Sequence, residues 1–284
     1  MKLVALALAL AAAGCTTSPS RLDPVTAAKT SDAPATGASP ASAEPDDRLA
    51  RLERRLDKVT KVLDQALGPP EPDAAAMYAV PINEQDPIEG PRDAKVTVVE
   101  AYEFLCPYCF MVNPMVEQIR AKYPNDVRVV SKYLVIHGEP AATAGAYACA
   151  AGKQGKFTEM KTALWSNLWK TENGRPQAHP EEIANLDAVA ATLGLDRQRL
   201  TADLGTCKQW LQSGQRELAP VGVHATPSFF VNGRPLRDNS LASFDKLVAE
   251  ELDKASRSTV AAADYYSREV VAKGLTAVKS RFAD

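Results

Sequence analysis

The chain has few histidines and cysteines and lacks an excess of charge of either sign. Its 284 residues include only three histidines and five cysteines, and 33 Lys+Arg against 35 Asp+Glu leave a formal net charge of −2. A charge so nearly balanced provides neither a basic stripe for a phosphate backbone nor an acidic tail. Zinc needs several ligands at suitable spacing, and the three histidines are isolated. We therefore expect no metal, no other cofactor and no nucleic-acid partner.

The apolar run near the start of the chain is too short to span a bilayer, which takes about 20 residues. This run, LVALALALAAA at residues 3–13, follows Lys2 and ends in small residues. The pattern is typical of an export signal that is removed from the mature protein. We assign the signal to residues 1–14 and expect the protein to act outside the cytoplasm.

The end of this segment, Ala12-Ala13-Gly14-Cys15, resembles the lipobox of bacterial lipoproteins. The resemblance implies that Cys15 is acylated and anchors the protein to a membrane of the bacterial cell envelope, facing the periplasm. In one respect the match is imperfect, because Leu is usual where Ala12 stands. The alternative is ordinary cleavage after Ala13, which leaves Cys15 a free thiol.

Five cysteines in an exported chain leave one over after pairing, and lipidation of Cys15 would account for it. If Cys106 and Cys109 form a redox pair, Cys149 and Cys207 are candidates for a structural disulfide, which an oxidising compartment favours. The alternative is that these two cysteines are separate buried thiols that act as small hydrophobic residues.

The segment before the main domain changes character at residue 46. Residues 15–45 are almost entirely small, polar or proline, so they cannot bury enough surface to fold and we expect a disordered tether. Residues 46–67 instead carry apolar residues at alternating spacings of three and four: Leu49, Leu52, Leu56, Val59, Leu63 and Ala66. This is a heptad seam, which favours a helix that dimerises or one that packs on its own domain. Three heptads are marginal for a stable coiled coil, so both alternatives remain open.

The remaining chain predicts an α/β domain over residues 78–255. Strands are expected at residues 95–101, 127–135 and 226–231, and helices at 107–122 and 243–254. Between the second and third strands, residues 139–220 form a mostly helical stretch. The dipeptide Asn232-Gly233 is a hairpin signal. A further helix is expected over residues 257–284, with no assigned role.

The sequence Cys106-Pro107-Tyr108-Cys109 lies between the first strand and the helix that follows it. Two cysteines at this spacing can close a disulfide across one helical turn. The first lies where the partial positive charge of the helix N-terminus stabilises a thiolate, so Cys106 is expected to be the nucleophile. Cys109, less exposed, would resolve the mixed disulfide formed with a substrate.

The strand before the cysteines, the C-P-Y-C motif and the later Thr226-Pro227 together resemble the thioredoxin superfamily. The helical insertion makes the resemblance closest to its DsbA-like branch. The resemblance implies a thioredoxin fold with a helical insertion, a cis proline at Pro227 beside the disulfide, and a Thr226 backbone that pairs with substrate. Pro107 and Tyr108 would border the same substrate site.

The resemblance also implies acid–base groups. Glu100 matches the buried acid that moves the proton of the resolving cysteine, and burial would raise its pKa toward neutrality. Lys132 matches a lysine that faces this acid in DsbA-like proteins. The alternatives are a solvated glutamate and a lysine at a strand edge. Glu103, three residues before Cys106, is expected at the exposed rim.

Tyr108 leaves the direction of the chemistry open. Strongly oxidising DsbA proteins carry His at this position, and a neutral Tyr hydroxyl stabilises the Cys106 thiolate less. We predict a protein-disulfide oxidoreductase that oxidises or exchanges disulfides in exported proteins and is reset by a membrane redox partner. A disulfide isomerase or reductase is the alternative. A non-catalytic envelope scaffold is a second alternative, in which the cysteines form a static bridge.

Overall fold

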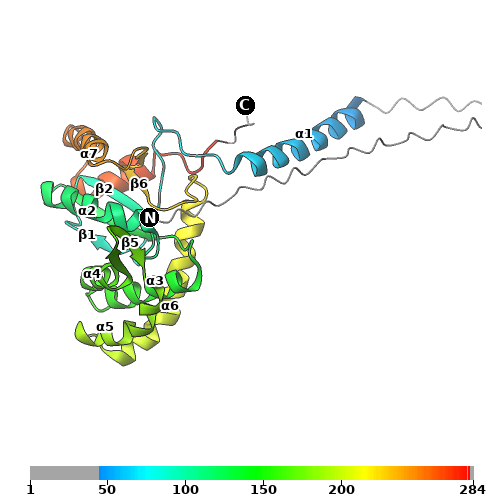
Figure 1. Ribbon diagram of the computed structural model, residues 1–284. Coiled ribbons are helices and arrows are strands. Elements are labelled where there is room, and N and C mark those ends of the chain that lie inside the picture. Colours follow the sequence, from blue (N-terminus) through cyan, green and yellow to red (C-terminus); the bar gives the residue numbers. More distant parts are fainter. Residues whose placement is uncertain (1–44, 280, 282–284) are drawn as a thin grey trace, which may run out of the picture. The chain divides into compact units, whose positions relative to one another are not determined.

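The computed structural model describes residues 45–279 and 281 (Figure 1). The first element is helix α1 (Pro45–Leu67), which ends at Gly68, a residue with a φ of 71°. Its seam lies open to solvent, because Leu49, Leu52, Leu56 and Val59 are each more than half exposed. The predicted signal peptide, the lipidation residue Cys15 and nearly all of the predicted tether lie outside the described residues.

A five-stranded sheet forms the centre of the domain. In spatial order its strands are β1 (Ile88–Glu89), β3 (Val127–Tyr133), β2 (Val96–Tyr102), β6 (Ser228–Val231) and β7 (Arg234–Pro235). Strands β2 and β3 are parallel and are joined by helix α2 (Pro107–Lys122), whereas β6 runs antiparallel to β2. The β6–β7 hairpin turns at Asn232 and Gly233, whose φ values of 44° and 79° are both positive, as the dipeptide predicts.

The two faces of the sheet are covered by different segments. Helices α2 and α7 (Leu241–Ser256) cover one face, where the core includes Val98, Val116, Ile119, Phe229, Phe244 and Val248. The other face packs against residues near both ends of the domain, among them Tyr78, Tyr265, Tyr266 and Val270. Both faces are therefore sealed, which explains why β2 is buried along its entire length.

The C-terminal segment is helical over a shorter stretch than expected. It contains α8 (Ala262–Tyr265) and the π-helix η2 (Tyr266–Val271), and then the chain extends. The Leu275 N–H donates to the Met77 carbonyl, and the Ala79 N–H donates to the Leu275 carbonyl, each across 2.8 Å. This pairing with the link before the sheet replaces further helical hydrogen bonds.

The helical insertion lies between β3 and β6. Its elements are α3 (Gly138–Gly152), α4 (Phe157–Leu168), strands β4 (Trp169–Glu172) and β5 (Arg175–Ala178), the 3-10 turn η1 (Pro180–Asn185), α5 (Leu186–Thr192) and α6 (Arg197–Leu218). The β4–β5 hairpin was not predicted, although its turn contains Asn173-Gly174 with φ values of 50° and 73°. The predicted α/β class with a helical insertion is confirmed.

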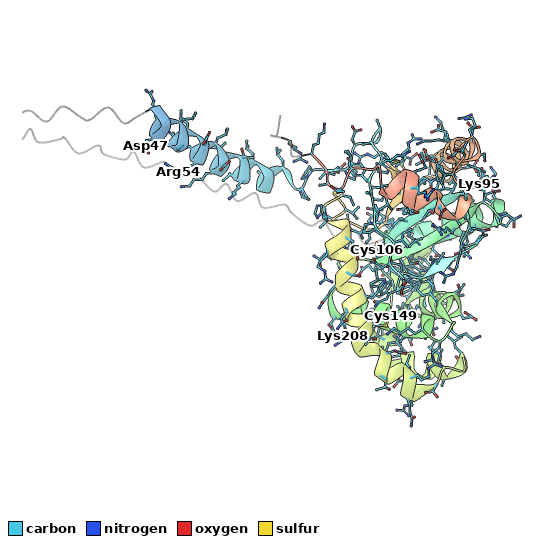
Figure 2. All side chains as sticks on the ribbon, turned by 180° about the vertical axis from the view of Figure 1, so that it is seen from behind. Asp47, Arg54, Lys95, Cys106, Cys149 and Lys208 are labelled. Carbon is cyan, nitrogen blue, oxygen red and sulfur yellow. A yellow bond between two sulfur atoms is a disulfide. The ribbon has the colours of Figure 1, made fainter. Side chains whose placement is uncertain are left out.

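Cys149 of α3 and Cys207 of α6 form a disulfide, with Cα atoms 5.8 Å apart and a sequence separation of 58. The bond joins two helices that pack along each other in the insertion. Figure 2 labels Cys149 in the insertion and Cys106 close to the sheet. Cys106 and Cys109 are free thiols, so the structure shows the reduced state of that pair.

Candidate active site

The Cys106-Pro107-Tyr108-Cys109 motif forms the first turn of α2. Cys106 is the N-cap residue, in an extended conformation, and its Sγ accepts a hydrogen bond from the Cys109 N–H across 3.3 Å. Pro107 occupies the first helical position, where its missing N–H costs nothing. Tyr108 is 67% exposed, so its hydroxyl side chain stands in solvent. A sulfur at this cap receives the stabilisation that helix N-termini provide to anions.

The loop before β6 completes the surroundings of Cys106. The Thr226-Pro227 peptide bond is cis, and the Cys106 thiol donates a hydrogen bond to the Thr226 carbonyl across 3.4 Å. The Thr226 hydroxyl is buried and has no hydrogen-bond partner among the described residues. Sequence reasoning assigned a role only to the Thr226 backbone, whereas the Thr226 side chain also helps to lower the pKa of Cys106.

The two cysteines differ in acidity. The Cys109 thiol donates a hydrogen bond to Cys106, and this bond, with the Thr226 hydroxyl and the backbone N–H groups of α2, outweighs burial and lowers the pKa of Cys106 to about 6. Burial raises the pKa of Cys109, and the proximity of the Cys106 thiolate raises it further. Cys106 is therefore the thiolate at neutral pH, and Cys109 keeps its proton.

Glu100 lies on the side of β2 that faces α2. In a strand successive side chains alternate in direction, so Glu100 shares its face with Val96 and Val98, which pack against α2. The carboxyl is 1% exposed, and its Oε2 has no hydrogen-bond donor among the described residues. Burial raises the pKa of Glu100, and the Lys161 ammonium offsets this rise only in part.

Lys132 does not face Glu100, and this expectation was wrong. In the parallel β2–β3 ladder Glu100 lies opposite Ser131, and Lys132 lies opposite Ala101. Lys132 consequently points to the other face of the sheet, where its ammonium contacts Asp86 and Glu217. The lysine near Glu100 is instead Lys161, whose Nζ lies 3.6 Å from Glu100 Oε2.

Lys161 comes from the helical insertion, and sequence reasoning missed it. A usable signal was present in α4, where Phe157, Met160, Leu164, Trp165 and Leu168 form one buried stripe. Lys161 occupies a position within that stripe, and it is 2% exposed. A charged residue at a core position of an amphipathic helix indicates a buried partner.

Glu103 is fully buried, contrary to the expectation that it lies at the exposed rim. One carboxylate oxygen accepts hydrogen bonds from the Ile136 and His137 N–H groups across 3.2 and 3.3 Å. The other contacts His137 Nδ1. Glu103 therefore attaches the turn before Cys106 to the start of the helical insertion, because the short loop after β3 supplies its donors.

Aromatic residues of the insertion also support the active-site turn. The Trp169 indole N–H donates to the Phe104 carbonyl across 2.7 Å, and its ring stacks on Phe110 with centroids 4.9 Å apart. Trp165 packs edge-on against Phe104 at 4.9 Å. These contacts hold the residues on both sides of the cysteines, so the insertion shapes the site as well as covering it.

A cavity of about 510 Å³ lies beside Pro227. Its walls include His224 and Pro227 from the loop before β6, Ser228 at the start of β6, and Arg237 after β7. Residues 67–69, 71–72 and 281 also line the cavity, and Arg281 donates to the carbonyls of Leu67, Gly68 and Pro69. The cavity is therefore lined both by the α/β domain and by residues that precede and follow this domain in the sequence.

Within residues 45–279 and 281, no group of three or more His, Cys, Asp or Glu side chains is placed to hold a metal ion. In the same part of the chain no helix is both long and apolar enough to cross a membrane.

Residues 82–250 match the protein family described as thioredoxin. Among curated proteins, the Na(+)/H(+) antiporter NhaA of Herminiimonas arsenicoxydans is 35% identical over 205 residues, which are 70% of this chain and 30% of that protein. The chain thus spans less than a third of the length of the curated relatives it matches.

Solved structures share the fold. BdbD from Bacillus subtilis, in its oxidised form, aligns with a TM-score of 0.53 and 19% identity, over 63% of this chain and 98% of that one. Wolbachia pipientis α-DsbA1 aligns with a TM-score of 0.52 and 16% identity, over 62% of this chain and 95% of that one. In both cases the alignment covers nearly the whole of the other chain.

Proposed function

The chain belongs to the thioredoxin family, and from that membership we propose that it is a protein thiol-disulfide oxidoreductase that acts on exported proteins through Cys106 and Cys109. One observation carries the proposal. The Cys106 sulfur caps α2, accepting from the Cys109 N–H at 3.3 Å, and also contacts the Thr226 carbonyl at 3.4 Å beside the cis Pro227. A nucleophile, its resolving thiol and a backbone site for an extended peptide therefore share one location.

In the oxidising direction the protein begins with a Cys106–Cys109 disulfide. A substrate thiolate attacks Cys106 Sγ, the bond between the cysteines breaks, and a mixed disulfide joins Cys106 to the substrate. Cys109 leaves as a thiolate and takes up a proton. A second substrate thiolate then attacks the substrate sulfur of the mixed disulfide, which releases the oxidised substrate and the Cys106 thiolate. The two electrons gained must pass to a membrane redox partner before another cycle.

Glu100 is the proposed acid–base catalyst for Cys109. The raised pKa of the buried Cys109 makes its thiolate a poor leaving group unless a proton reaches it. Glu100 lies beneath α2, and burial raises its pKa, so it keeps its proton to higher pH than an exposed glutamate does. It would donate a proton when Cys109 leaves and accept one when Cys109 attacks.

The peptide substrate is proposed to pair with the Thr226 backbone and to extend into the cavity beside Pro227. The open cavity of about 510 Å³ has room for side chains of an extended segment. Pro107 and Tyr108 are exposed next to Cys106 and would contact the same peptide. Main-chain pairing gives affinity without demanding one sequence, which suits a protein with many substrates.

The direction of the reaction follows from the reduction potential of the Cys106/Cys109 couple. The Cys106 pKa of about 6 lies between about 7 for thioredoxin and about 3.5 for DsbA. We expect a potential between about −270 mV, typical of thioredoxin, and about −120 mV, typical of DsbA. Equilibration with glutathione buffers measures it. A value at the thioredoxin end would favour a reductase or isomerase, and a pair that does not exchange at all would leave only a scaffold role.

We also propose that Cys15, outside the described residues, is lipidated and holds the protein at the cell envelope facing the periplasm. The basis is the lipobox-like sequence, and acyl chains contribute about 0.8 kcal/mol for each buried methylene. Fractionation of cells that express the wild type or Cys15→Ser tests this. The variant should move from the membrane fraction to the soluble fraction; an unchanged distribution would contradict lipidation.

A further inference from the structure

Lys161 is a buried cation that lies between two buried carboxylates. Its ammonium donates to Glu89 Oε2 across 2.8 Å and lies 3.6 Å from Glu100 Oε2. All three side chains are 4% exposed or less. One buried positive charge can neutralise only one of two buried carboxylates, so the other carboxyl tends to keep its proton. The surroundings of each carboxyl decide which of the two is ionised.

The surroundings favour ionisation of Glu89. Lys161 donates to Oε2 of Glu89, and the other oxygen, Oε1, accepts from Arg120 across 3.2 Å and from the Thr158 hydroxyl across 3.0 Å. Burial alone would raise the pKa of Glu89, but the Lys161 charge and hydrogen bond, with Arg120, keep it below its ordinary value. Glu89 therefore holds the negative charge that pairs with Lys161.

The carboxylate form of Glu100 is stabilised less than that of Glu89, because Lys161 lies farther from it. The charged and titratable groups around it are Glu89 from β1, Tyr102 from β2, Glu117 from α2 and Lys161 from α4; Ser131 of β3 lies opposite Glu100 in the sheet. Arg120 of α2 pairs with Glu89. Among the described residues none of them donates a hydrogen bond to Glu100 Oε2. The Tyr102 ring lies beneath the Lys161 ammonium, 5.4 Å from its centroid, so it supports the cation and not the carboxylate.

We propose that Lys161 and Glu89 act as positioning residues for Glu100: their pairing sets the pH at which Glu100 exchanges its proton with Cys109. This deepens the proposed function and rests on it. The helical insertion supplies Lys161, and the short edge strand β1 supplies Glu89. The proton affinity of the catalytic carboxyl is thus controlled by two elements outside the β2–α2–β3 unit that carries Glu100 and the cysteines.

The proposal predicts shifts of opposite sign. In Lys161→Met, Glu100 loses the buried cation that lies 3.6 Å from its Oε2, so it should ionise at higher pH. In Glu89→Gln, Lys161 loses its main partner and a nearby negative charge disappears, so Glu100 should ionise at lower pH. We expect each shift to be about one pH unit, the lower end of the effect of a charge within about 4–6 Å. Loss of stability alone would not move the two variants in opposite directions.

The experiment follows the two thiol steps of the reduced full-length protein with 5,5′-dithiobis(2-nitrobenzoate). Cys106 attacks this aromatic disulfide and releases one thionitrobenzoate. Cys109 then gives up its proton and attacks Cys106 Sγ, which breaks the mixed disulfide and releases the second thionitrobenzoate. The rate of the second release as a function of pH reports the step that Glu100 assists. Glu100→Gln should remove its inflection.

Two controls separate electrostatics from folding. Lys161→Arg keeps the cation and should keep the inflection within a few tenths of a pH unit of the wild type. Lys132→Met removes another fully buried lysine that pairs with two carboxylates, but on the opposite face of the sheet. It should lower stability without moving the inflection. It also shows how much destabilisation the assay tolerates.

The outcomes distinguish the two proposals. If the first release is absent in the wild type, the proposed thiol chemistry fails. If both releases occur in the wild type but Lys161→Met and Glu89→Gln leave the inflection in place, or shift it in the same direction, the role of Lys161 and Glu89 is wrong and the proposed function stands. If Lys161→Met does not fold, the Glu89→Gln shift alone decides, since a shift to higher pH or none contradicts the proposal.

Discussion

The Cys106 thiol donates a hydrogen bond to the Thr226 carbonyl across 3.4 Å, although 120 residues separate the two in sequence. A peptide that pairs with the backbone at Thr226, as proposed, would therefore lie beside the Cys106 sulfur. The same loop brings the Thr226 hydroxyl, which has no hydrogen-bond partner among the described residues, close to this sulfur. The loop thus contributes to the acidity of Cys106, and it is also the segment proposed to bind substrate.

The acidity of Cys106 predicts the pH dependence of its reactivity. Its pKa is lowered from 9.0 to about 6, so the thiol is protonated below pH 6 and is almost entirely thiolate above pH 7. Alkylation of the reduced protein by iodoacetamide should rise through an inflection near pH 6 and then level off, because the thiolate is the reactive form. Mass spectrometry of the labelled peptide gives the rate. An inflection near pH 9 would contradict the assignment of Cys106 as the nucleophile.

Thr226→Val should shift that inflection upward. The substitution keeps the shape of the side chain but removes the hydroxyl that stabilises the Cys106 thiolate. In the neutral form this hydroxyl has no hydrogen-bond partner among the described residues, so the effect comes from the hydrogen bond that it can donate to the thiolate. Such a bond to a charged group is worth about 1.5–3 kcal/mol, which corresponds to about one pH unit or more. Thr226→Ser is the matched control, because it retains the hydroxyl and should behave as the wild type does. Identical profiles for Val and Ser would show that the hydroxyl does not contribute.

Two glycines of α6 should respond to alanine in opposite ways. A Cβ at Gly214 would collide with the backbone carbonyl of Tyr133, whereas a Cβ at the exposed Gly205 meets open space. Gly214→Ala should lower the free energy of unfolding by about 1–3 kcal/mol through overpacking. Gly205→Ala should raise it by up to about 1 kcal/mol, because alanine is the better helix former. Urea unfolding measures both, and equal effects would contradict the close packing of α6 on β3.

The Cys149–Cys207 disulfide should affect stability without affecting redox chemistry. Its closed loop of about 57 residues is worth up to about 4 kcal/mol in the chain-entropy model. The double variant Cys149→Ala/Cys207→Ala should unfold at lower denaturant concentration and keep the alkylation profile of Cys106. A changed profile in the folded variant would show that this bond also shapes the active site.

Helix α1 is proposed to join two or more copies of the chain. Its exposed seam has heptad spacing, and in a parallel coil Arg48 of one copy would lie near Glu53 of the other. Sedimentation of the wild type at tens of micromolar should show an oligomer, and Leu56→Asp in the seam should show a monomer. Lys61→Asp, on the opposite face, should leave the oligomer intact. A monomeric wild type would contradict self-association.

Several features were predictable because they depend on residues close together in sequence. Proline at the first helical position and the apolar spacing after it predict a helix over 107–122, and α2 has these bounds. The heptad spacing predicts α1, and Asn232-Gly233 predicts the β6–β7 turn. The same turn signal at Asn173-Gly174 was overlooked, because the surrounding stretch is rich in helical patterns.

The groups around the redox pair depend on distant parts of the chain. Glu100 lies opposite Ser131 because β2 and β3 pair in one particular parallel register, and a shift of one residue would have turned Lys132 toward Glu100. Glu103 is buried because the loop after β3 covers it. Lys161 reaches Glu100 because α4 packs over this end of the sheet.

The sequence alone determined the class of fold, which the structure confirms, and it predicts Cys106 as the nucleophile and Cys109 as the resolving thiol. Each of these rests on local spacing and on residue types that few other structures require. Only the tertiary structure decided which lysine neighbours Glu100, where the Thr226 hydroxyl lies and that Cys149 is bonded to Cys207. Strand register and helix docking bring these groups together, and both are set by the packing of the entire core.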